Sequence, residues 1–247
     1  MSKIRVSAVS YTNTEPFNYG LQHSEVLNKI DLSFDHPSDC AQKLIDDEVD
    51  IGLVPVAALL NIPQYEIISD YCIGANGAVN SVFIFSNKSI DQIATLRLDL
   101  QSRTSNNLAK VLLKNYWKVH PVYSQDSETD AFVEIGDRTF GKADKYPFVY
   151  DLAQEWKNFT GLEFVFAVWA SNKPIDSNFV IEFNAALKSG VNNIPKVIAK
   201  LTKRDDFDLD DYLTNKIDYP LTESKRAALK LFLNYVKEIN SIKSLVE

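Results

Sequence analysis

The chain has 247 residues, of which 45% are hydrophobic and 24% are charged, and its formal net charge at pH 7 is −7. The composition is ordinary for a folded globular protein, and the length is enough for one large domain or two small ones. The excess of negative charge argues against non-specific binding to nucleic acids or to anionic membranes, so we expect neither as a partner.

The sequence predicts a cytoplasmic protein without a structural metal. No apolar run approaches the roughly 20 residues that span a membrane, and the N-terminus lacks the apolar core of a signal peptide. Cys40 and Cys72 are too few for a disulfide framework, and we expect both to be buried thiols. The histidines, His23, His36 and His120, are scattered along the chain, so we expect no metal site.

Strands and helices alternate over the first third of the chain. The expected elements are strands at residues 4–9, 32–34 and 50–54 and helices at residues 15–21, 38–47 and 55–60. The first of these helices has Thr14 as its candidate N-cap and Pro16 in its first turn. This alternating order predicts a parallel sheet with right-handed crossovers.

A second strand-rich unit occupies the middle of the chain. Its expected elements are strands at residues 79–85, 96–100, 121–123, 131–137 and 162–170 and helices that begin near residues 102 and 152. The pattern is helical from about residue 175 onward, and the last helix is expected at residues 222–239.

Two strand-rich crossings, at residues 79–86 and 164–171, divide the chain into two lobes. We expect residues 1–86 and 171–247 to form the first lobe and residues 87–170 to form the second. Two parallel-sheet lobes joined by two strands describe the two-lobe, type II periplasmic-binding-protein-like α/β fold. Ligands in that architecture lie in the cleft between the lobes, at strand carboxyl ends and helix N-termini.

A hydroxyl-rich helix start, Ser102-Arg103-Thr104-Ser105, predicts an anion site. The first amides of a helix lack intrahelical acceptors and lie at the positive end of the helix dipole. Three hydroxyls exceed what capping needs, and a guanidinium stands in the same turn. The alternative is an ordinary capped helix whose Arg103 is solvated or forms an ion pair between the lobes. We therefore expect the protein to bind a small organic anion.

Three further loops follow or precede strands and are expected to face the same cleft. Asn13 either hydrogen-bonds a ligand or only caps a helix. Gly77 permits positive φ or a close backbone approach, and Ser81 beyond it either binds a ligand or bonds to backbone. Gly136 and Asp137 either orient a ligand hydroxyl or simply begin a turn.

Several motifs of common enzymes are absent from the sequence. No Gly-x-Gly-x-x-Gly follows a strand and no Walker loop is present, so we expect no nucleotide and no other cofactor. The nucleophile elbow Gly-x-Ser-x-Gly is also missing. The four loops contain no His or Cys, so general-base catalysis by a side chain has weak support.

In these loops the chain resembles the chorismate dehydratases of the futalosine route to menaquinone. The motifs that carry the resemblance are Ser10–Pro16, Asp50–Pro55, Gly77–Val82, Ser102–Ser105, Ile135–Asp137, Tyr150–Leu152 and Phe164–Trp169. Each is weak alone, but they occur in family order over roughly residues 4–170. Two positions depart from the family pattern, Glu163 in place of proline and Glu15 in place of a neutral or basic residue. We expect Glu15 to point away from the cleft.

The resemblance implies a lyase that removes water from chorismate, a dicarboxylate, to give 3-[(1-carboxyvinyl)oxy]benzoate. We assign one substrate carboxylate to the start of the helix at residue 102 and the other to the region of Ser81. Asn13 and Ser81 are the expected catalytic residues. The expected substrate-binding residues are Thr12, Gly77, Ser102, Arg103, Thr104, Ser105, Gly136 and Asp137. Since the loops lack a base, we expect the enolpyruvyl carboxylate of the substrate to remove the proton.

Three alternatives stay open at this stage. The sister enzyme 1,4-dihydroxy-6-naphthoate synthase shares the fold and is expected to use a His base, but nothing around His120 matches a catalytic loop. A non-catalytic solute-binding protein would carry an export signal, which we do not find. A regulator's effector domain would follow a DNA-binding helix-turn-helix, and none precedes the first strand. The sequence does not indicate an oligomeric state.

Overall fold

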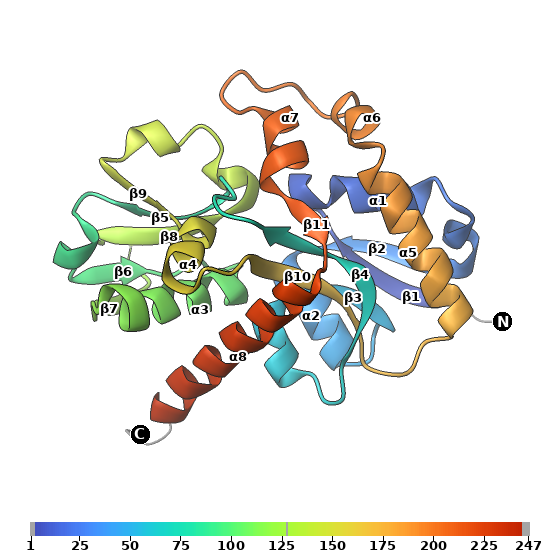
Figure 1. Ribbon diagram of the computed structural model, residues 1–247, viewed down its shortest axis with the longest axis horizontal. Coiled ribbons are helices and arrows are strands. Elements are labelled where there is room, and N and C mark those ends of the chain that lie inside the picture. The colour runs from blue at the N-terminus through green and yellow to red at the C-terminus, as the bar shows by residue number, and fades with distance from the viewer. Residues whose placement is uncertain (1–2, 127, 244–247) are drawn as a thin grey trace.

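The computed structural model describes residues 3–126 and 128–243 and shows two lobes, each built around one β-sheet (Figure 1). The larger sheet has six strands in the order β11-β4-β10-β3-β1-β2. Its strands are β1 (Ile4–Val9), β2 (Ile30–Asp35), β3 (Ile51–Pro55), β4 (Glu66–Ala75), β10 (Phe164–Ser171) and β11 (Asp218–Pro220). The helices of this lobe are α1 (Glu15–Gln22), α2 (Pro37–Ile45), α5 (Ser177–Val191), α6 (Ile194–Ile198) and α7 (Leu209–Asp211).

The smaller sheet has five strands in the order β7-β6-β8-β5-β9. Its strands are β5 (Val82–Ser86), β6 (Thr95–Arg97), β7 (Val122–Ser124), β8 (Ala131–Ile135) and β9 (Phe148–Asp151). The helices α3 (Arg103–Leu112) and α4 (Leu152–Thr160) belong to this lobe. All five residues of β3 and all five of β5 are buried, so each sheet has a strand in the core.

Both sheets are mixed, which corrects the expectation of parallel sheets. β1 pairs in parallel with β2 and β3, as the alternating order predicts. β10 instead runs antiparallel to both β3 and β4, and β5 runs antiparallel to β8 and β9. The cause is the passage of the chain between the lobes, because a strand that returns from the other lobe enters the sheet from its opposite end.

The strand expected at residues 96–100 ends early. β6 covers only Thr95–Arg97, Asp99 is buried, and Leu100 is 85% exposed. Asn106 explains the early end, since its side chain accepts from Asp99 N at 2.9 Å and donates to Asp99 O at 2.7 Å. These are the bonds that a neighbouring strand would otherwise make. The period-two pattern of leucines therefore predicts a strand that is longer than the observed one.

Sheet membership suggests a division into lobes that differs from the expected one. β5 pairs in the smaller sheet, whereas the expected boundary after residue 86 assigns it to the first lobe. β10 pairs in the larger sheet, whereas the expected boundary after residue 170 assigns it to the second. We therefore propose that residues 76–81 and 161–163 are the two connections between the lobes.

The long C-terminal helix α8 (Glu223–Lys243) contacts both lobes. Its Phe232 ring lies 5.0 Å from Phe164 on β10 and 6.0 Å from Trp156 on α4, as centroid distances. Lys225, at its beginning, is fully buried and donates to Asp218 O, Pro220 O and the Asp218 carboxylate at 2.6–2.8 Å. The helix is thereby fixed to β11 and braces the two lobes from one side (Figure 1).

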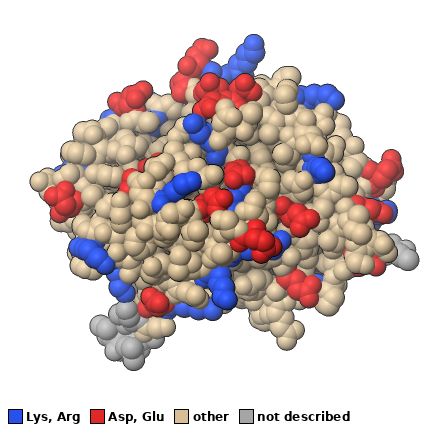
Figure 2. Space-filling model, viewed as in Figure 1, with Lys and Arg blue, Asp and Glu red and all other residues tan. Residues whose placement is uncertain are grey.

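Charges of both signs are interspersed on the face that Figure 2 shows, and they form no continuous basic patch there. Within residues 3–126 and 128–243, none of the helices has the length and apolar composition that crossing a membrane requires.

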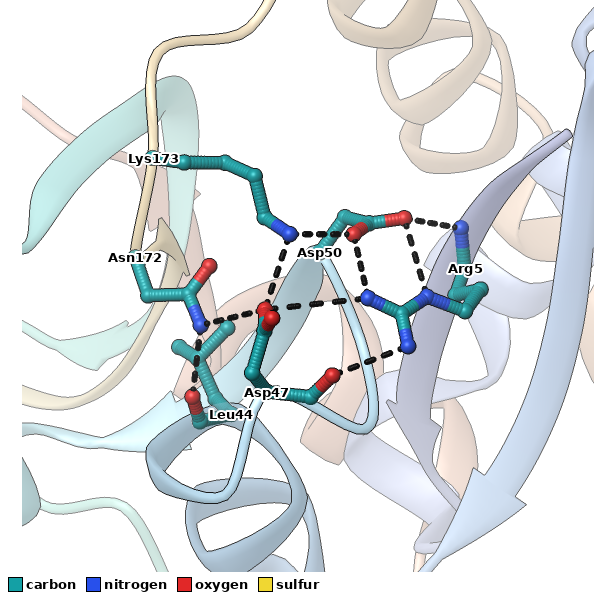
Figure 3. Close-up of polar contacts among 6 residues, drawn as sticks. All are labelled: Arg5, Leu44, Asp47, Asp50, Asn172 and Lys173. Carbon is teal, nitrogen blue, oxygen red and sulfur yellow. Dashed lines mark hydrogen bonds and ion pairs between the residues drawn. The ribbon is translucent and has the colours of Figure 1, made fainter. Parts of the chain in front are cut away.

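An ion-pair network joins the ends of three adjacent strands of the larger sheet (Figure 3). Asp50, just before β3, accepts from Arg5 on β1 at 2.7 Å and from Lys173, after β10, at 2.8 Å. Lys173 also pairs with Asp47 at 2.8 Å. Burial alone would raise the pKa of Asp50, but the hydrogen bonds from Arg5 and Lys173 outweigh it and hold that pKa well below its usual range.

Replacement of this carboxylate should make stability depend less on pH. Because the folded-state pKa of Asp50 is depressed, its stabilisation is complete above the unfolded pKa of about 3.9 and is lost as the pH falls below it. We expect Asp50→Asn to lower the free energy of unfolding by about 1–2 kcal/mol at pH 7, and by less at pH 3. Urea denaturation from pH 3 to 7 measures this, with the exposed Asp91→Asn as control. A difference that stays constant with pH would contradict the assignment.

Candidate active site

A cavity lies between the two lobes, at the carboxyl ends of β1 and β8 and the N-terminus of α3. It encloses about 570 Å³ of space not filled by atoms, including the part that opens to solvent. Its polar lining includes five of the residues predicted to bind or to react, Asn13, Ser81, Ser102, Thr104 and Ser105, and a sixth, Gly136, lines it with backbone. The rest is mainly apolar: Val9, Pro37, Leu53, Pro55, Ile73, Val79, Val82, Ile135, Phe166 and Ala167.

The start of α3 forms one wall of the cavity. Ser102 is the N-cap, and its Oγ accepts a hydrogen bond from Ser105 N at 3.1 Å. Thr104 and Ser105 are buried, and Thr104 Oγ1 accepts from Ala57 N of the other lobe at 3.2 Å. Because Thr104 Oγ1 already accepts from the protein, its own proton is free to donate to a ligand. The wall therefore offers hydroxyl donors beside the positive end of a helix.

Polar contacts cross the mouth of the cleft. Thr12 donates from its hydroxyl to Asp137 Oδ2 at 2.9 Å, and Tyr11 Oη donates to Gln101 Oε1 at 3.0 Å. Gly136, with φ of +65°, faces the Tyr11 ring so closely that an added Cβ would lie 3.4 Å from Cε2. These contacts hold the lobes together over the cavity.

Four residues predicted to bind substrate do not line the cavity. Thr12 and Asp137 bind each other instead. Gly77 has φ of +109° and shapes the loop before Ser81 without lining the cavity. Arg103 is exposed and lies outside the lining. Their predicted contact with substrate, like that of the lining residues, stays a prediction.

Asn13 belongs to a short 3₁₀ turn, Thr12–Thr14, that follows β1. Thr14 occupies the N-cap position of α1 and Pro16 lies in its first turn, as predicted, but the Thr14 hydroxyl hydrogen-bonds Val9 O at 2.6 Å and Tyr11 O at 2.7 Å and caps no helix amide. The turn is thus held by Thr14, and the side chain of Asn13 is not needed for capping. Glu15 lies outside the lining and accepts from Asn18 at 3.2 Å.

One residue behind the cavity escaped the sequence interpretation. Tyr212 is 1% exposed, and its hydroxyl donates to Ser81 Oγ at 2.8 Å. It lies 131 residues from Ser81 in the chain, in a short π-helical turn, Tyr212–Lys216. No local sequence pattern predicts such a contact. The apolar pattern of that segment is the same for a tyrosine that is simply buried in the core.

Among the described residues, Tyr11 is the only ionisable side chain that lines the cavity. Burial raises its pKa above the usual value, and the nearby Arg138 only partly opposes this. A phenol of raised pKa is protonated at neutral pH and is a poor general base. In the described part of the chain, no group of three or more His, Cys, Asp or Glu side chains is placed to hold a metal ion.

The contact between Thr12 and Asp137 can be tested by an isosteric change. We expect Thr12→Val to lower the free energy of unfolding by about 1 kcal/mol and to speed amide hydrogen exchange at the start of α3, because the lobes separate more often. Thr129→Val is the matched control, since Thr129 donates to Ala131 O within one lobe at 2.9 Å. Equal exchange at α3 in the two variants would show that Thr12 does not hold the cleft closed.

The chain matches the family described as menaquinone biosynthesis over residues 4–238. A chorismate dehydratase of Thermus thermophilus is 27% identical over 258 aligned positions, which cover 90% of this chain and 91% of that protein. A chorismate dehydratase of Campylobacter jejuni is 30% identical over 183 positions, which cover 69% of each chain.

Solved structures establish the fold. A protein of Archaeoglobus fulgidus superposes with a TM-score of 0.73 at 18% identity, covering 98% of both chains. The periplasmic aliphatic sulphonate-binding protein of Escherichia coli superposes with a TM-score of 0.54 at 12% identity, covering 97% of this chain and 93% of that one. The predicted two-lobe, periplasmic-binding-protein-like fold is confirmed.

Proposed function

We propose that this chain, which belongs to the menaquinone biosynthesis family, dehydrates chorismate to 3-[(1-carboxyvinyl)oxy]benzoate. The observation that carries the proposal is the chemistry of the cavity. Its polar lining consists of hydroxyls, one amide and a helix start, and among the described residues it includes no Lys, Arg, His, Asp or Glu. Such a lining suits a substrate that needs to be held and oriented.

The start of α3 is the proposed binding site for one carboxylate of chorismate. A carboxylate there accepts from Thr104 and Ser105 and interacts with the helix dipole. The protein carries a formal net charge of −7, so its overall field opposes an anion. The attraction is therefore local and comes from neutral donors whose positions are fixed before the substrate enters.

The reaction removes the ring proton at the ether-bearing carbon and the hydroxyl on the neighbouring carbon. The electron pair of the broken C–H bond enters the ring, the C–O bond to the hydroxyl breaks, and the ring becomes aromatic. Among the described residues, Tyr11 is the only ionisable group in the lining and is a poor base. The enolpyruvyl carboxylate of the substrate therefore accepts the proton and passes it to the departing hydroxyl, which leaves as water. Asn13 holds the leaving hydroxyl, and the protein supplies orientation and water exclusion.

The site argues against one rival function and leaves the other to be decided by an assay of turnover. The naphthoate synthase alternative needs a histidine base, and His23, His36 and His120 are all exposed and outside the lining. A passive anion-binding protein has the same cleft and differs only in not turning over its ligand. We retain the cytoplasm as the proposed location and a free small molecule as the proposed partner.

Turnover of chorismate tests the proposal directly. Purified protein incubated with chorismate is expected to form an aromatic product, seen in the ultraviolet and identified by a mass 18 Da below that of chorismate. The control is the same protein after heat denaturation, because chorismate also decomposes slowly without a catalyst. Chorismate that binds but is recovered unchanged would identify a binding protein instead.

Substitutions in the lining should separate catalysis from binding. Asn13→Ala is expected to lower kcat about 100-fold with less than a fivefold change in KM, since Asn13 stabilises the leaving group mainly in the transition state. Thr104→Val removes a donor from a substrate carboxylate in both states and should raise KM about tenfold at nearly constant kcat. Steady-state kinetics measure both. The opposite pattern would exchange the two assigned ends of the substrate.

A further inference from the structure

Tyr212 contacts Ser81, one of the two residues expected to be catalytic. Its hydroxyl donates to Ser81 Oγ at 2.8 Å. Ser81 precedes the first strand of the smaller sheet. The C-terminal third of the chain thus supplies a buried partner for a residue that lines the cavity.

The direction of this bond determines what the substrate meets. The one proton of the phenol goes to Ser81 Oγ. Ser81 Oγ, having accepted from Tyr212, must direct its own proton elsewhere. Ser81 lines the cavity, so that proton is available to the substrate. The bonds then run in one sense, from Tyr212 to Ser81 and on to the ligand, and each strengthens the next.

We propose that Tyr212 is a positioning residue of the dehydration, which fixes Ser81 as a hydrogen-bond donor toward the substrate. This inference rests on the proposed function. Tyr212 itself does not line the cavity, so it acts through Ser81 and does not contact the substrate.

The surroundings of Tyr212 hold its ring in one place. Phe140 and Phe207 contact it edge-on, with centroids 5.3 and 5.2 Å away. Phe140 and Phe207 themselves stack at 3.7 Å, which docks the segment before Tyr212 onto the smaller lobe. Burial raises the pKa of Tyr212, so the phenol keeps its proton and remains a donor throughout the neutral range.

A purely structural role for the hydroxyl is the competing explanation, and a double-mutant cycle distinguishes the two. The variants are Tyr212→Phe, Ser81→Ala and the two combined, each assayed for kcat and KM with chorismate and for thermal stability. Tyr150→Phe is the matched control, because its hydroxyl accepts from Ile90 N at 2.8 Å in the smaller lobe, away from the cavity.

We expect Tyr212→Phe to lower kcat about tenfold with less than a threefold change in KM, and Tyr150→Phe to leave kcat within twofold of the wild type. In the Ser81→Ala background, Tyr212→Phe should lower kcat by less than threefold, because the group through which it acts is gone. That non-additivity is the sign of a positioning role.

Three outcomes would overturn the inference. They are an unchanged kcat in folded Tyr212→Phe, a full tenfold loss that persists in the Ser81→Ala background, and loss of folding in Tyr212→Phe when Tyr150→Phe folds normally. Failure of the proposed function is recognised separately, since the wild-type protein would then leave chorismate unchanged.

Discussion

A carboxylate that leaves water must find hydrogen-bond donors in its new surroundings, and in the proposed function neutral groups provide them. The cost of burying an unpaired charge is several kcal/mol, so the donors must be in place before the substrate arrives. Thr104 and Ser105 at the start of α3 are the proposed donors on one side of the cavity, and Ser81 is the proposed donor on the other. The two lobes bring these side chains to one cavity.

Polar contacts also hold the two lobes together. Ala57 N of one lobe reaches Thr104 of the other, so the same hydroxyl that faces the cavity also joins the walls. Thr12 and Asp137 close the mouth, and α8 braces the opposite side through Phe232. The described residues of the lining include no Lys, Arg, His, Asp or Glu, so the proposed reaction takes its base from the substrate.

Local signals made the helix start at residue 102 predictable, since the bond from Ser105 N to Ser102 Oγ spans three residues. The alternation of strands and helices likewise revealed the fold class. Contacts between distant segments could not be foreseen. Thr12 and Asp137 are separated by 125 residues, and Tyr212 and Ser81 by 131. The sequence therefore does not predict that Asp137 pairs with Thr12, and it does not single out Tyr212. The contact of Asp137 with substrate stays a prediction. Arg103 is predicted to bind substrate because of its charge, and the structure places it on the exposed side of the helix.

In the proposed mechanism the protein holds the substrate and the substrate supplies the base. A chorismate analogue in which the enolpyruvyl carboxylate is replaced by its amide separates these two roles. We expect the analogue to bind in the cavity with an affinity within about tenfold of that of chorismate, yet to form no aromatic product. Turnover of the amide at the rate of chorismate would overturn this mechanism and would require a base on the protein.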